Sequence, residues 1–86
     1  MATSILIVED EQDIRELLEF TFLRDGYDVI AAETAEIALQ KIDIKLPDMI
    51  VVDWMLPGMD GIDLAKRLRR DELTADLPIV MLTARG

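Results

Sequence analysis

Residues 5–11 read ILIVEDE, so four consecutive apolar residues are followed at once by three acidic residues. The apolar part is rich in β-branched side chains and is continuous rather than alternating, which is typical of a strand buried on both faces of a parallel sheet. Similar runs occupy residues 49–52 and 79–82, whereas residues 27–32 form a weaker run that contains Asp28. The weaker run predicts a strand nearer to an edge of the sheet. The sequence therefore predicts four parallel strands.

Helical patterns separate the predicted strands. Apolar residues recur at helical spacing over residues 14–22, 35–42 and 62–68. Thr34 and Asp60 stand just before the second and third of these patterns, where they are predicted to cap the helices. Strands and helices thus alternate along the chain. This order predicts an α/β fold with right-handed crossovers and a doubly wound parallel sheet that carries helices on both faces.

The composition of the chain excludes several classes of function. Its 86 residues suffice for one small domain, and its formal charge of −9 disfavours nucleic acid or an anionic membrane as a direct partner. The absence of cysteine and histidine excludes disulfides, thiol nucleophiles, Ser-His-Asp catalysis and imidazole zinc sites. No apolar run approaches the ~18 residues of a membrane span, and the amino terminus lacks the pattern of a signal peptide. We therefore expect a cytoplasmic protein.

Acidic residues follow two of the predicted strands at their carboxyl ends. Glu9 and Asp10 follow the first strand, and Asp53 follows the third. Ligands bind beyond the carboxyl ends of parallel strands, so these three residues converge if the two strands are neighbours. Any one of them alone is more simply explained as a helix cap or a loop residue. Three carboxylates together favour a bound cation, and with only oxygen ligands available that cation is Mg²⁺, or Mn²⁺ in its place.

Such a site predicts phosphoryl chemistry. A metal-bound aspartate, here Asp53, can attack phosphorus and form an acyl phosphate. Thr83, at the end of the fourth predicted strand, can donate its hydroxyl to a phosphoryl oxygen. The small side chain of Ala84 leaves room for the phosphoryl group, and its backbone N–H offers a further donor.

These motifs, taken in order, resemble the receiver domains of bacterial response regulators. The motifs that carry the resemblance are the acidic run after residues 5–8, the segment 47–53, the segment LPGMDG at 56–61 and the segment PIVMLTA at 78–84. Within the family, the pair Glu9-Asp10 and the segment DWMLPG at 53–58 resemble the OmpR/PhoB class. Residues 70–74 add a likeness to the phosphate-regulon members of that class.

The resemblance implies a fold, a set of roles and a partner. It implies a five-stranded flavodoxin-like (CheY-like) sheet with strand order 2-1-3-4-5. Asp53 corresponds to the phosphoacceptor, Glu9 and Asp10 to the acidic magnesium pair, the carbonyl of Met55 to the backbone metal ligand, and Thr83 to the switch hydroxyl. The family is not a separate enzyme: it takes its phosphoryl group from a sensor histidine kinase or from acetyl phosphate, and it accelerates its own dephosphorylation.

Part of the family's pattern is not in this sequence. The family continues with a helix, a fifth strand followed by a lysine, and a last helix, so we interpret residues 1–86 as a partial receiver domain. The lysine would pair with the phosphoryl charge, so weakened phosphorylation is expected. An uncovered apolar fourth strand predicts self-association through that edge. The DNA-binding domain is also missing, so direct contact with nucleic acid is not expected.

Two other readings remain open at this point. A phosphatase of the haloacid-dehalogenase kind also uses a strand-end aspartate and magnesium, but it needs a second aspartate two positions later, where this chain has Met55. The other alternative is an interaction or scaffold module that keeps the fold and never carries phosphate. The carboxylates and Thr83 argue against that alternative for a complete receiver domain, whereas for residues 1–86 alone it stays open.

Overall fold

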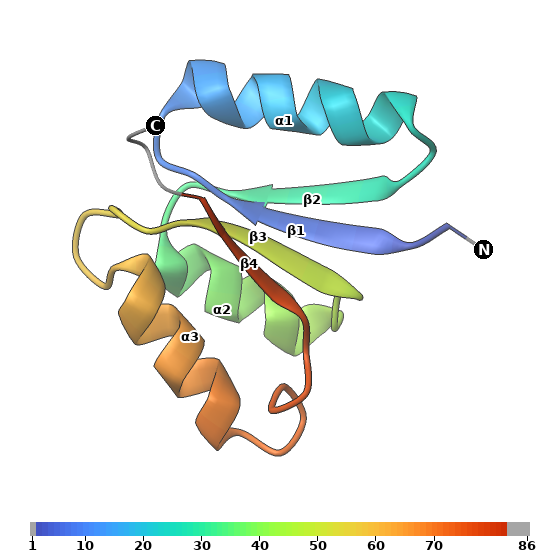
Figure 1. Ribbon diagram of the computed structural model, residues 1–86. Helices are drawn as coiled ribbons and strands as arrows, with labels where there is room; N and C mark the ends of the chain where they lie inside the picture. Colours follow the sequence, from blue (N-terminus) through green and yellow to red (C-terminus); the bar gives the residue numbers. More distant parts are fainter. Residues whose placement is uncertain (1, 83–86) are drawn as a thin grey trace.

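The computed structural model describes residues 2–82, in which strands and helices alternate in the predicted order. The elements are β1 (Ser4–Val8), α1 (Gln12–Arg24), β2 (Asp28–Ala32), α2 (Ala35–Ile44), β3 (Met49–Asp53), α3 (Gly61–Arg70) and β4 (Ile79–Leu82). The strands pair in parallel, in the order β2-β1-β3-β4 (Figure 1). The α/β fold is confirmed, as is the order that the resemblance implies for these four strands. The strand β2 lies at an edge, as predicted.

The sheet is buried on both faces because its strands point alternate side chains into two cores. Ile5 of β1 belongs to a core in which Phe22 of α1 also packs. Leu6, the next residue, belongs to the opposite core together with Ala38 of α2 and Leu64 of α3. Figure 1 shows the same arrangement, with α1 on one face of the sheet and α2 and α3 on the other. This burial on both sides explains why the strands read as continuous apolar runs.

Side-chain hydrogen bonds cap the N-termini of α2 and α3, as the sequence predicts. The Thr34 hydroxyl oxygen accepts a hydrogen bond from the amide of Ile37 at 3.1 Å. The Asp60 carboxylate accepts one from the amide of Asp63 at 2.9 Å. These bonds satisfy amide groups that the first turn of a helix leaves without partners. The cap at Asp60 fixes where α3 begins, directly after the loop that follows β3.

The strand register brings the carboxyl ends of β1, β3 and β4 to one edge of the sheet. Val8 pairs with Val52, and Asp53 pairs with Leu82. Residues that follow β1 and residues at the end of β3 are therefore neighbours, although more than forty positions separate them along the chain. This pairing is the structural basis of the site described below.

The strand β4 lies at the other edge of the sheet that the described residues form. Two of its side chains, Val80 and Met81, are 44% and 37% exposed. Self-association through this strand stays a prediction. Among residues 2–82, no helix combines the length and apolar character that crossing a membrane requires.

The core position of Leu64 supplies a test of this packing. Leu64 is fully buried between α3 and the sheet, whereas Leu73 is 79% exposed. Leu64→Ala should lower the free energy of unfolding in urea by about 2 to 5 kcal/mol, because it removes buried methyl groups and leaves a cavity. Leu73→Ala, the same chemical change at the surface, should alter it by less than about 0.5 kcal/mol. Equal effects of the two substitutions would contradict this arrangement of the core.

Candidate functional site

Three carboxylates meet at the carboxyl edge of the sheet. Glu9 and Asp10 follow β1, and Asp53 ends β3. Each of the three offers one oxygen, and these oxygens all lie within 4.8 Å of one another. Opposite ligands of an octahedral Mg²⁺ ion are about 4.2 Å apart, because each oxygen is about 2.1 Å from the metal. The three oxygens are therefore spaced closely enough to share one such ion.

Burial of this cluster shifts the protonation of Glu9. Glu9 and Asp53 are only 3% and 6% exposed, whereas Asp10 is exposed. The pKa of Glu9 is raised from 4.5 to about 7, chiefly because burial removes water from its carboxylate. The negative charge of Asp53 and hydrogen bonds with Asp10 and Asp53 raise it further, while the hydrogen bond from the amide of Glu11 opposes the shift. Carboxylates held so close together are a typical cation site.

The acidic run after β1 does not serve as a helix cap. The side chain of Glu11, the residue at the N-cap of α1, makes no capping hydrogen bond. The Glu9 carboxylate accepts its backbone hydrogen bond from the amide of Glu11, at 3.0 Å, and so stays at the strand end. The capping interpretation weighed for these residues therefore does not describe the start of α1.

Backbone contacts hold Asp53 in place. One carboxylate oxygen of Asp53 accepts a hydrogen bond from the amide of Met55 at 3.1 Å. The amide of Gly61, the first residue of α3, donates to the carbonyl oxygen of Trp54 at 3.1 Å. A Cβ atom at position 61 would lie only 2.5 Å from the carbonyl oxygen of Asp53. The chain thus needs glycine at position 61 so that α3 can begin directly against the end of β3.

Several predicted site residues remain without a structural role. No hydrogen bond of the described residues defines a role for the carbonyl oxygen of Met55, whose metal contact stays a prediction. Thr83 and Ala84 lie outside the described residues, and the roles predicted for them are likewise untested.

Arg15 of α1 also contacts the acidic run after β1, although no sequence motif points to it. Its guanidinium donates hydrogen bonds to the carbonyl oxygens of Glu9 and Asp10, at 3.0 and 3.4 Å. It also lies 3.9 Å from the Glu33 carboxylate, after β2. The only sequence signal for this contact is an arginine one turn into the helix that follows the acidic run. Such a signal does not distinguish an arginine that reaches back to the loop from one that faces solvent.

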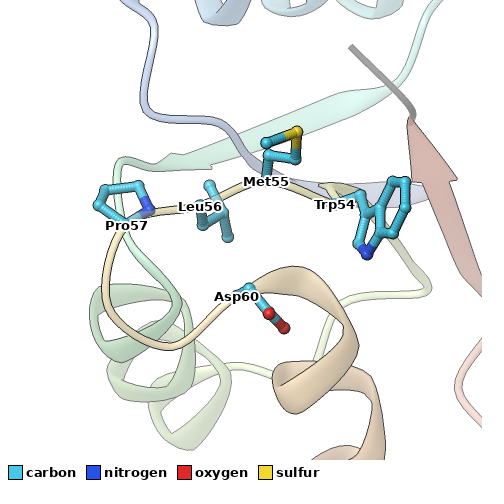
Figure 2. A pocket seen from close by; sticks show the side chains of 5 residues that line it. All are labelled: Trp54, Met55, Leu56, Pro57 and Asp60. Carbon is cyan, nitrogen blue, oxygen red and sulfur yellow. The ribbon is translucent and has the colours of Figure 1, made fainter. Parts of the chain in front are cut away.

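An open groove lies along the loop between β3 and α3, which follows Asp53 in the chain. It has a volume of about 590 Å³ and is lined by Trp54, Met55, Leu56, Pro57 and Asp60 (Figure 2). Figure 2 shows the Trp54 ring beside the end of β4, and the amide of Trp54 donates to the carbonyl oxygen of Leu82 at 3.0 Å. Trp54 is 44% exposed.

Residues 5–86 match the family model described as the response regulator receiver domain. Among curated proteins, the chain is 52% identical over 83 residues to the phosphate regulon transcriptional regulatory protein PhoB of Pseudomonas aeruginosa, covering 96% of this chain and 36% of that protein. It is 48% identical over 85 residues to the alkaline phosphatase synthesis transcriptional regulatory protein PhoP of Bacillus subtilis, covering 99% and 35%. The chain thus spans little more than a third of these relatives.

Solved structures share the fold. A putative response regulator from Chloroflexus aurantiacus superposes with a TM-score of 0.96 at 45% identity, covering all of this chain and 70% of that one. The chemotaxis protein CheY4 of Vibrio cholerae gives a TM-score of 0.94 at 30% identity, with coverages of 100% and 72%. These findings confirm the resemblance that the sequence motifs indicate, including the likeness to phosphate-regulon regulators.

The raised pKa of Glu9 predicts how pH changes the stability of the metal-free protein. Between pH 4.5 and 7 the folded protein keeps a proton on Glu9 that the unfolded chain has released. The stabilisation from this residue is therefore complete below pH 4.5 and is lost as pH rises through 7. Relative to Glu9→Gln, the free energy of unfolding of the wild-type protein in EDTA should fall by about 2 to 3 kcal/mol across this range.

Chemical denaturation in urea at a series of pH values measures this difference. Glu72→Gln, which removes a carboxylate from an exposed loop, serves as the matched control and should keep the wild-type profile. If the free energies of unfolding of the wild-type protein and Glu9→Gln differ by a constant amount from pH 4.5 to 8, the pKa of Glu9 is not raised in the folded protein.

The close contact at Gly61 reverses the expected effect of a glycine-to-alanine substitution on stability. Replacing glycine by alanine within a helix normally stabilises a protein by up to about 1 kcal/mol. Gly61→Ala should instead destabilise this protein by about 1 to 3 kcal/mol, because the new Cβ collides with the Asp53 backbone. Urea unfolding measures the change. A stabilised Gly61→Ala variant would show that α3 does not press against the end of β3.

Proposed function

Because this chain belongs to the response regulator receiver domain family, we propose that it is the phosphoacceptor module of a PhoB-like transcriptional regulator and that Asp53 carries the phosphoryl group. The observation that carries this proposal is the meeting of Glu9, Asp10 and Asp53 at the carboxyl edge of the sheet. A buried aspartate among other carboxylates, beside an open groove, suits an acceptor that works together with a divalent cation.

The same cluster supplies the ligands for that cation. We assign one oxygen each from Glu9, Asp10 and Asp53, together with the carbonyl oxygen of Met55, to a Mg²⁺ site that also accepts Mn²⁺. All of these ligands are hard oxygen donors, which both ions prefer. An ion held there would neutralise negative charge on the carboxylates and on the incoming phosphoryl group. Glu9 would then favour its deprotonated form at neutral pH, because a positive charge lowers the pKa of a nearby carboxyl.

Asp53 acts as the nucleophile. Its free carboxylate oxygen attacks the phosphorus atom of the donor, and the bond between phosphorus and the donor atom breaks as the acyl phosphate bond forms. The electron pair of the broken bond stays on the leaving group, an imidazole nitrogen of phosphohistidine or an oxygen of acetyl phosphate. The hydrogen bond from the amide of Met55 holds the other oxygen of Asp53 and orients the carboxylate for the attack. The predicted contacts of Thr83 and Ala84 with the phosphoryl group belong to the same proposal.

A sensor histidine kinase is the proposed donor, because the chain belongs to the response regulator receiver domain family. The groove along Trp54 and Pro57 is the proposed route by which the donor reaches Asp53. The names of the curated relatives describe those proteins as transcriptional regulators, and we extend this role to the protein of which this chain is a part. The chain itself spans 36% to 38% of the PhoB proteins. A cytoplasmic location belongs to the same proposal.

Phosphorylation by a small donor tests the role of Asp53. Incubation of the protein with acetyl phosphate and Mg²⁺ should give a mono-phosphorylated species that is stable to acid and labile to base. Asp53→Asn should abolish this species, whereas Asp76→Asn, which alters an exposed loop, should leave it unchanged. Intact-mass spectrometry measures the adduct, and peptide mapping locates it.

Two results would contradict the proposal. The first is an adduct that persists in Asp53→Asn. The second is no adduct in the wild-type protein although Mg²⁺ still binds, which would favour a module that interacts without carrying phosphate.

A further inference from the structure

We propose that Arg15 is a positioning residue that sets the Mg²⁺ affinity of the site by holding the peptide carbonyls of Glu9 and Asp10. This inference rests on the proposed function, because it concerns the same metal site. Among the described residues, Arg15 makes no hydrogen bond to the carboxylates that are proposed to bind the metal. Its contacts are with the backbone from which two of the three carboxylates project.

Arg15 connects α1 to the loop that precedes it, and its two hydrogen bonds to the carbonyl oxygens of Glu9 and Asp10 are called the clamp below. Arg15 projects from α1, while Glu9 and Asp10 belong to the loop that joins β1 to α1. One nitrogen of its guanidinium donates to both carbonyl oxygens, at 3.0 and 3.4 Å. The Arg15 side chain is only 14% exposed. Hydrogen bonds from a charged donor are stronger than neutral ones, and low exposure strengthens them further.

The contact between Arg15 and Glu33 is weaker and has another effect. The two charged groups are 3.9 Å apart, and the Glu33 side chain is 68% exposed. Exposed pairs of this kind contribute little to stability. Glu33 partly compensates the charge of Arg15 close to a site that must accept a cation. The clamp on the loop therefore depends on the two carbonyl contacts rather than on the ion pair.

Arg15 has two opposite effects on Mg²⁺ affinity, and the direction in which the affinity changes on its replacement shows which one dominates. The positive charge of Arg15 repels a cation, so removal of that charge alone would tighten Mg²⁺ binding. Removal of the clamp frees the loop and loosens binding, because Glu9 and Asp10 must then be ordered when the ion binds. The second effect should dominate, since residues that orient metal ligands typically change metal affinity by about 10- to 100-fold when replaced.

The experiment is a titration with MgCl₂, followed by the fluorescence of Trp54, the single tryptophan of the chain. Arg15→Gln should weaken Mg²⁺ binding about tenfold. Arg15→Lys, which keeps a charged donor, should recover most of the loss. The matched control is Arg24→Gln, which removes an arginine from the far end of the same helix, where the side chain is 65% exposed. It should leave the affinity within about twofold of the wild-type value. Urea unfolding in EDTA confirms that all variants are folded during the titration.

Three outcomes would overturn the inference. Unchanged or tighter Mg²⁺ binding in Arg15→Gln shows that the clamp does not organise the loop. An equal loss in Arg15→Gln and Arg24→Gln shows that the loss does not come from the hydrogen bonds between Arg15 and the carbonyl oxygens of Glu9 and Asp10. If the wild-type protein binds Mg²⁺ and Asp10→Asn loses it, the proposed metal site stands whichever way the Arg15 variants behave. If the wild-type protein gives no response by fluorescence or calorimetry, the metal site and the inference fail together.

Discussion

Repulsion among three carboxylates is the constraint on which the site depends. The parallel pairing of β1 with β3 forces Glu9 and Asp53 to the same edge of the sheet, and the two cores on either side exclude water from both. In the metal-free protein the pKa of Glu9 is raised chiefly by burial and further by the charge of Asp53, so a proton on Glu9 relieves part of this repulsion. A bound divalent cation would relieve it more completely, which supports the proposed metal site.

The loops around this edge keep the carboxylates from relaxing apart. Gly61 allows α3 to begin against the backbone of Asp53, and the cap at Asp60 fixes that beginning. On the other side, Arg15 connects α1 to the carbonyls of the acidic loop. The elements around the site therefore hold the carboxylates in place, whereas the carboxylates supply the negative charge. An acceptor of phosphoryl groups needs both, because the attacking oxygen must be aligned and its charge must be neutralised.

The sequence predicts the fold well because burial on both faces leaves a local signal. Residues 5–8 are continuously apolar since their side chains alternate between two cores, and Thr34 and Asp60 cap helices through contacts only three residues long. The meeting of Glu9 with Asp53 was predicted on the condition that β1 and β3 are neighbours, an order that the family resemblance implied and the structure confirms. The clamp at Arg15 and the contact at Gly61 were not, because each depends on how a helix is docked against a strand end, and no residue pattern encodes that distance.

The most direct test of this account is diffraction from crystals grown with Mn²⁺, which scatters anomalously and takes the same oxygen ligands as Mg²⁺. We expect one strong anomalous peak between the carboxylates of Glu9, Asp10 and Asp53, at about 2.2 Å from its ligands. A peak elsewhere on the molecule, with the three carboxylates free of metal, would contradict it.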